Sequence, residues 1–148
     1  MASNEGPLAR QTLRNFLTLY HHFRNSNRQI SELGVHPREF SVLRMLYERG
    51  PVTMGEVQAY IYRSPSTAST RIAKMEEQGH VTRTRSKEDN RVVHVELTEE
   101  GRRIAVGTPM QGIPLLRRRL DSLPPDKLTR INDALNDLLT LMEVETDG

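Results

Sequence analysis

The feature that most constrains the fold of this chain is a change of periodicity at Gly79. Before this glycine two helix-start signals follow one another closely. Thr53-Met54-Gly55-Glu56 has the pattern of a capping box, and Ser64-Pro65 has the pattern of an N-cap followed by proline in the first helical turn. After it, Val81–Arg85 alternates and Val92–Leu97 is rich in β-branched residues, which is typical of strands. The sequence therefore predicts two short helices followed by a β-hairpin.

Two helices are predicted upstream of this region. Apolar residues recur at spacings of three and four over Leu8–Asn25, and Leu33 can continue the stripe until Gly34 breaks it. Pro37 can open the next helix, because its missing N–H costs nothing in a first turn, and Gly50-Pro51 closes it.

Two further helices are predicted downstream of the hairpin. Thr98 begins the first of them, with acidic residues in its first turn, and the glycines and prolines of Gly107–Pro114 should break or kink it. A last helix runs from about Pro125 to Met142 and carries a long apolar stripe, which requires a partner surface. The predicted fold class is mainly α with a small two-stranded β-wing, in the order of a winged helix-turn-helix.

Composition excludes several classes of protein. The 148 residues are about one domain's worth and contain no cysteine, which excludes disulfides, thiolate metal sites and cysteine nucleophiles. No apolar run approaches the roughly 18 residues of a membrane span. No basic segment followed by an apolar stretch stands at the N-terminus, so we expect no signal peptide, no membrane partner and a cytoplasmic protein.

The distribution of charge is more informative than the net charge of +2. From Arg63 to Arg91 there are seven basic and four acidic residues, whereas from Asp121 onward there are seven acidic and two basic residues. A locally basic centre and an acidic end predict that the centre faces a polyanion.

A helix enters the major groove of B-DNA only when its outward face lacks bulky apolar groups and offers hydrogen-bond donors. The helix after Ser64 meets this condition, and its N-terminus favours phosphate. The hairpin adds four cations suited to a narrow minor groove, and Asp89 can orient Arg91. The predicted DNA-contacting residues are Ser64, Ser66, Thr67, Thr70, Arg71, Lys74, Arg83, Arg85, Lys87, Asp89 and Arg91.

Three motifs between Gly79 and Gly101 resemble the signature of MarR-family regulators: Gly79-His80-Val81-Thr82-Arg83, Asp89-Asn90-Arg91 and Leu97-Thr98-Glu99-Glu100-Gly101. In that family the first glycine ends the recognition helix and the following arginine opens the wing. The Asp-x-Arg pair lies at or near the wing tip. The Leu-Thr-x-x-Gly element begins the helix that returns to the dimer interface.

The resemblance implies a homodimeric, sequence-specific transcriptional regulator that binds a near-palindromic operator in duplex DNA, and it favours a repressor that a small ligand releases. It implies one domain over residues 1–148, with a winged helix-turn-helix lobe at about 36–97 and a helical dimerisation region at about 8–33 and 98–143. The implied dimerisation residues are Leu13, Leu17, Leu128, Ile131, Leu135, Leu138 and Met142.

The same resemblance implies a small, often aromatic ligand between the dimerisation helices and the DNA-binding lobe, with Tyr20, His21, Arg24 and Tyr47 as candidate contacts. Two features depart from the family pattern. Thr70 stands where many members have arginine, while Arg71 takes a usually apolar position, so we expect a different operator. The interruption at Gly107–Pro114 falls in what is usually a continuous helix, and it bears on the geometry of the dimer.

The sequence also bears on two other classes of function, an enzyme and a protein-binding module. No phosphate-binding loop, nucleophile elbow or His-Glu-x-x-His motif is present, and five scattered histidines without cysteine do not favour a metal site, so we expect no enzyme, cofactor or metal. A winged-helix module that binds an acidic protein instead of DNA stays open as the alternative. The arginine-bearing hairpin beside an uncluttered helix face argues against that alternative.

Overall fold

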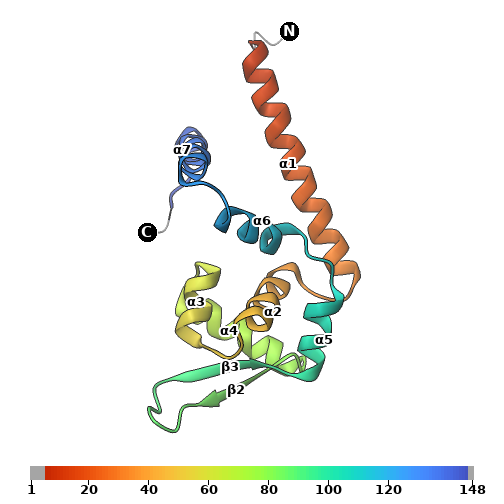
Figure 1. Cartoon of the computed structure of the whole chain (residues 1–148), viewed down its shortest axis with the longest axis vertical. Helices are drawn as coiled ribbons and strands as arrows, with labels where there is room; N and C mark the ends of the chain where they lie inside the picture. Colours follow the sequence, from red (N-terminus) through yellow and green to blue (C-terminus); the bar gives the residue numbers. More distant parts are fainter. Residues whose placement is uncertain (1–5, 147–148) are drawn as a thin grey trace. The chain divides into compact units, whose positions relative to one another are not determined.

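The computed structural model describes residues 6–146, which divide into one compact unit ending at Ile113 and a second beginning at Pro114 (Figure 1). The elements of the first unit are α1 (Pro7–Glu32), α2 (Pro37–Arg49), β1 (Val52–Thr53), α3 (Met54–Ile61), α4 (Pro65–Glu77), β2 (Val81–Arg85), β3 (Val93–Leu97) and α5 (Glu99–Gly107). Helix α6 (Gly112–Asp121) starts at the end of the first unit, and α7 (Pro125–Leu141) belongs to the second. The predicted mainly helical fold with a β-wing is confirmed.

Helix α1 continues past Asn25 and ends at Glu32, which agrees with the longer of the two predicted ends, before Gly34. Ser26 and Ile30 are buried, so the polar residues around Ser26 continue the helix because its last turns pack against the rest of the first unit. Such packing overrides a weak local stop signal. Leu33 caps the helix, and Gly34 follows at a φ of 83°.

The starts of the next two helices are fixed by local caps. His36 Nδ1 accepts a hydrogen bond from the backbone N–H of Arg38 at 3.2 Å, with Pro37 in the first turn of α2. Thr53 and Glu56 form the predicted capping box of α3. These caps satisfy backbone donors that a helix leaves unpaired at its N-terminus.

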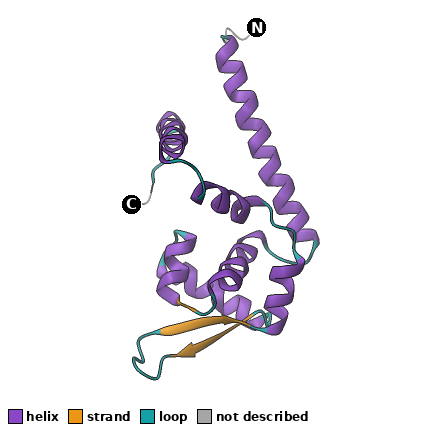
Figure 2. Cartoon of the chain, in the orientation of Figure 1, coloured by secondary structure: helices purple, strands orange, loops and turns teal. Residues whose placement is uncertain are grey.

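The sheet has three antiparallel strands in the order β1-β3-β2: the predicted two-stranded wing of β2 and β3, and the short strand β1, which was not predicted (Figure 2). The strand that was not predicted is the two-residue β1, in which Val52 pairs with Val95 and Thr53 pairs with His94. Two residues are too few to show an alternating pattern, so pairing with β3 and burial of Val52 create this strand rather than local preference. The predicted hairpin itself is correct, with Val81 opposite Leu97 and Arg85 opposite Val93.

The core of the first unit lies where α2, α3, α4 and the sheet meet. Its largest fully buried side chains include Phe40, Leu43 and Met45. Ile30 of α1 and Ala105 of α5 belong to the same cluster, so the ends of these two helices are anchored on it. Removing these apolar side chains from water supplies the main driving force for this arrangement.

Two glycines explain the joins between α4, the wing and α5. Gly79 ends α4 at a φ of 78°, in the left-handed region that favours glycine. A Cβ on Gly101 would lie 2.0 Å from the carbonyl oxygen of His80, so only glycine fits there. Thr98 caps α5 by accepting from the Gly101 N–H at 3.0 Å, and its own hydroxyl donates to the carbonyl of Gly79. These contacts give a physical reason for the Leu-Thr-x-x-Gly motif.

The interruption predicted at Gly107–Pro114 is present, because α5 ends at Gly107. The break is shorter than predicted, since Gly112 already begins α6 and Pro114 lies in its first turn, where a missing N–H is tolerated. In the second unit, α7 buries none of its residues within the chain. None of the helices among residues 6–146 has the length and apolarity of a membrane span.

Candidate nucleic-acid interface

Helix α4 has one apolar and one polar face. Ala68, Ile72 and Met75 are buried in the core. The opposite face is exposed to solvent and carries the predicted contact residues Ser66, Thr67, Thr70 and Lys74. This face offers hydroxyl and ammonium donors without apolar bulk, as entry into a major groove requires.

Hydroxyl groups gather at the N-terminus of α4. The Ser64 side chain accepts from the Thr67 N–H at 3.3 Å, and its Oγ lies 3.1 Å from Ser66 Oγ and 3.0 Å from Thr67 Oγ1. Pro65 occupies the first turn. The predicted N-cap is confirmed, and it leaves an exposed cluster of donors at the positive end of the helix dipole.

A cleft of about 370 Å³ lies between the start of α2 and the polar face of α4. Lys74 Nζ lies 4.0 Å from Glu39 Oε1 across it, and the Glu39 side chain is only 6% exposed. Partial burial, together with the positive charges of Arg38 and Arg63, lowers the pKa of the Arg71 guanidinium. The residues that line the cleft are His36, Arg38, Glu39, Ser66, Thr67, Thr70, Arg71 and Lys74.

The cations of the wing are held by different partners. Arg83 donates twice from its guanidinium and once from its backbone N–H to the carboxylate of Glu76 on α4. These hydrogen bonds lower the pKa of Glu76. Arg85 donates to the carbonyl of Asn90 at 2.8 Å, across the turn. Arg83 therefore attaches the wing to α4.

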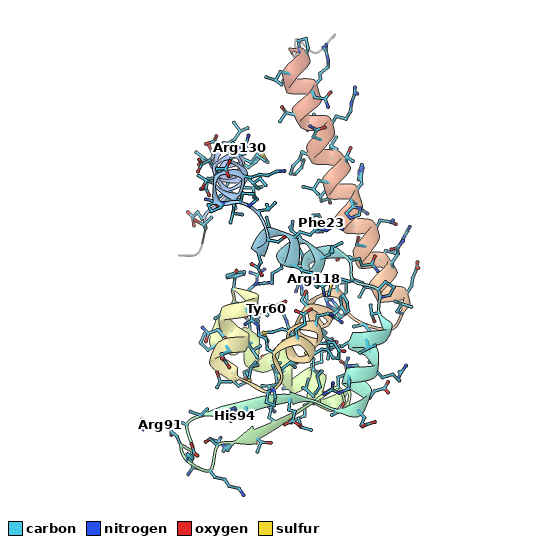
Figure 3. All side chains as sticks on the ribbon, viewed as in Figure 1. Phe23, Tyr60, Arg91, His94, Arg118 and Arg130 are labelled. Carbon is cyan, nitrogen blue, oxygen red and sulfur yellow. The ribbon has the colours of Figure 1, made fainter. Side chains whose placement is uncertain are left out.

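The tip of the wing presents Arg91 to solvent. Figure 3 shows this residue at the end of the hairpin, and its side chain is 92% exposed. Asp89 accepts from the Arg91 backbone N–H at 3.0 Å and lies 3.4 Å from Arg91 Nε, so the predicted orienting role of Asp89 is confirmed. Lys87 is exposed in the same turn. Arg85, Lys87 and Arg91 together place three cations around the hairpin tip.

The candidate ligand contacts on α1 lie on its exposed surface. The Arg24 guanidinium stands 5.9 Å from the centroid of the Tyr20 ring, which also stacks on Phe16. His21 and Arg24 line a shallow cavity of about 270 Å³ with Asn25 and Arg28. The fourth candidate is Tyr47 on α2. The guanidinium groups of Arg44 and Arg102 lie 5.0 and 5.7 Å from the centroid of its ring.

The predicted dimerisation residues are exposed on their own helices. On α1, Leu13 and Leu17 keep 48% and 41% of their surface accessible. On α7, Leu128 and Ile131 keep 37% and 36%, while Leu138 is half-buried. The two remaining predicted residues on this stretch, Leu135 and Met142, are 51% and 70% exposed.

Sequence reasoning missed two charged residues of the cleft, Arg38 and Glu39, and it missed Arg63, whose charge acts on Arg71. Arg38 and Arg63 are exposed near Arg71, whereas Glu39 is buried. The position of Glu39 in the first turn of α2 could have drawn attention to it, because a helix dipole favours an acid there. Its approach to α4 depends on the packing of two helices and has no local signal.

Comparison with known proteins agrees with this architecture. The model of the MarR family matches residues 35–93. Over 106 residues the chain is 28% identical to the Bacillus subtilis HTH-type transcriptional regulator YsmB, covering 72% of this chain and 73% of that protein. Two further regulators from B. subtilis, YpoP and YkoM, are 30% and 32% identical, over 61% and 50% of their own lengths.

Solved structures show the same fold. Streptococcus pneumoniae FabT in complex with DNA superposes with a TM-score of 0.59 at 22% identity, covering 90% of this chain and 96% of that one. A MepR-like protein complexed with pseudoligands superposes with a TM-score of 0.61 at 19% identity, over 93% and 97%. The winged lobe of this chain thus matches the MarR family model, and the fold of the chain agrees with that of these solved structures.

Proposed function

We propose that this protein is a homodimeric transcriptional regulator that binds duplex DNA at a near-palindromic operator, acts as a repressor and is released by a small aromatic ligand. The observation that carries the proposal is the exposed polar face of α4 beside a wing whose tip presents Arg85, Lys87 and Arg91. A helix of this kind fits a major groove, while the wing cations reach the phosphates or the minor groove next to it.

The shared attachment of helix and wing supports a joint role in binding. Glu76 and Arg83 tie the C-terminal part of α4 to the first strand of the wing, so that the two elements can approach DNA as one surface. Relatives whose names describe HTH-type transcriptional regulators, and a neighbour in fold solved in complex with DNA, add support.

A second copy of the chain supplies the symmetry that an operator of two half-sites requires. The apolar side chains of α1 and α7 remain exposed in a single chain, which leaves large apolar surface in water. Burying these faces against a second copy would place two α4 helices on one duplex. Half-sites would then lie about one helical turn, or roughly 34 Å, apart.

The proposed ligand site uses the exposed surface of α1. Tyr20 offers an aromatic face to stack against, and His21 and Arg24 offer donors to a phenolate or carboxylate. A neighbour in fold solved with pseudoligands is consistent with a ligand-responsive regulator. Titration of salicylate into the protein, followed by loss of DNA binding, would test this part of the proposal.

The test of DNA binding is the salt dependence of affinity for a mixed-sequence duplex. Each phosphate that a protein neutralises contributes about −0.9 to the log–log slope of affinity against salt. Replacing Arg91 by alanine removes one contact per protomer, so the slope of the dimer should become shallower by about 1.8.

The matched control is Arg103→Ala, which removes an arginine that is paired with Glu100 on α5 and is separate from the wing. This variant should keep the wild-type slope. A wild-type protein whose affinity does not respond to salt would contradict DNA binding, and it would favour the winged-helix module that binds an acidic protein.

A further inference from the structure

Beneath the polar face of α4 lies a buried carboxylate that a DNA-binding surface does not obviously need. Glu39 is only 4% exposed and stands in the first turn of α2, where the helix dipole stabilises its charge. Among the residues that line the cleft between α2 and α4, it is the only acid. A negative charge at this place repels the phosphates that the surrounding cations attract.

The carboxylate holds nearby cations on the recognition surface. Lys74 Nζ lies 4.0 Å from Glu39 Oε1, and the side chain of Lys74 is still 61% exposed. Glu39 also offsets part of the repulsion that Arg38 and Arg63 exert on Arg71. Lys74 can therefore leave Glu39 for an acceptor on DNA, but the departure leaves a buried charge without its partner.

Separating the pair has a modest cost, because the carboxylate is buried and keeps its desolvation penalty, whereas Lys74 is already largely in solvent. The cost is offset only when DNA offers Lys74 an acceptor in good geometry. DNA that brings a phosphate into the cleft but offers no acceptor within reach of Lys74 meets the carboxylate without that compensation. Repulsive elements of this kind raise specificity by weakening the wrong complexes.

We propose that Glu39 is a specificity-determining residue: its buried carboxylate opposes phosphate in the cleft and holds Lys74, so that DNA lacking a suitable acceptor for Lys74 is bound less well. Glu39 acts through Lys74 and is a positioning residue, not a direct DNA contact. The inference rests on the proposed DNA-binding function. It assigns to Glu39 a role in how the same surface distinguishes one DNA sequence from another.

The experiment compares two duplexes of equal length at one salt concentration. One is an operator enriched from random duplexes on the wild-type protein, and the other is a mixed-sequence duplex. In Glu39→Gln, which keeps the size of the side chain and removes its charge, affinity for the mixed-sequence duplex should rise by up to about fivefold, the upper end of the range expected for one partly screened charge interaction. Operator affinity should change less, so the ratio of the two affinities falls.

The control variant is Glu77→Gln, which removes one acid from the exposed end of α4 outside the cleft and should keep the wild-type ratio. A purely structural role for Glu39 would weaken binding to both duplexes in parallel. Parallel weakening, or an unchanged ratio in Glu39→Gln, would overturn the inference.

A second variant tests the same inference if Glu39→Gln does not fold. Lys74→Gln changes an exposed side chain, and it should lower the ratio by weakening operator binding more than mixed-sequence binding. Equal losses on both duplexes would assign Lys74 to phosphate contact and overturn the inference. A wild-type protein that binds neither duplex at low salt would instead defeat the proposed function itself, and the inference with it.

Discussion

Gly101 lies so close to the carbonyl oxygen of His80 that its position leaves no room for a side chain. This residue, Thr98 and Gly79 form the join between the end of α4, the base of the wing and the start of α5. The backbone N–H of Thr98 also donates to the His80 carbonyl at 3.1 Å. The orientation of the wing relative to α4 therefore depends on backbone contacts at a few residues.

Replacing Gly101 by alanine should destabilise the protein, because its Cβ would meet backbone atoms that cannot move away as a flexible side chain would. We expect a loss of about 1–3 kcal/mol in the free energy of unfolding, the usual cost of overpacking. Urea denaturation followed by circular dichroism measures it.

The control for this substitution is Gly107→Ala. No atom lies within 4 Å of a Cβ built there, and α5 ends at this residue. Its stability should be equal to or slightly above that of the wild type. Equal stability of the two variants would mean that the close approach at Gly101 is not a constraint.

Residues whose roles are local were predicted from the sequence. Ser64, Thr53 and Asp89 bind backbone groups within three residues, so the short patterns around them were sufficient. The partners of Arg83 and Lys74 lie on other elements, and no local pattern indicates them. Arg83 was thus predicted as a DNA contact, whereas the structure shows that it also holds the wing against α4.

At the scale of the elements, helix α4 and the wing are joined by the pair of Glu76 and Arg83. Hydrogen bonds from the side chain and backbone of Arg83 lower the pKa of the Glu76 carboxyl. A carboxylate with a lowered pKa in the folded state stabilises that state above its ordinary pKa, and the contribution is lost as the pH falls through the lowered value. Attachment of the wing should therefore weaken only in acid.

In Arg83→Ala the pKa of Glu76 should rise part of the way toward the ordinary value for glutamate, because its charged form loses the two guanidinium donors and keeps the backbone N–H of residue 83. A carbon-detected NMR titration of the side-chain carboxyl groups measures this shift. Glu100, whose pKa is lowered by a hydrogen bond from Arg103, provides an internal control and should titrate as in the wild type. No movement of the Glu76 pKa would show that Arg83 does not hold it.

The type of each helix and of the hairpin was predictable, because periodicity and caps are encoded over a few residues. The sequence did not decide between the two possible ends of α1, and it did not predict the strand β1. Burial of Ile30 extends α1, and pairing of Val52 with Val95 creates β1. Both depend on residues far away in the sequence, which compete with local preference.

At the scale of the whole molecule, the chain leaves apolar surface that a second copy would cover. Leu13, Phe16 and Leu17 on α1 are each between 41% and 49% exposed, and α7 has no buried residue. The dimerisation residues inferred from the resemblance stay predictions, because they concern contacts that one chain does not contain. The single-domain organisation inferred from the resemblance also stays a prediction.

Replacing Leu17 by aspartate should weaken dimerisation by about thirtyfold or more, the size of effect expected when a hot-spot contact of an interface is lost. Sedimentation velocity over a range of protein concentrations measures the shift from dimer to monomer. Leu19→Asp is the matched control, since Leu19 is 51% exposed on the same helix but faces away from the stripe of Leu13 and Leu17. Equal effects of the two substitutions would exclude this stripe as the interface.

The most direct test of the account is to map guanine N7 groups of the enriched operator whose methylation prevents binding, together with the number of protein copies on the duplex. We expect two copies of the protein on the duplex. We also expect two major-groove segments in which N7 methylation prevents binding, about one helical turn, or roughly 34 Å, apart. One copy on one segment, or binding that N7 methylation does not affect, would contradict a dimer that reads DNA through α4.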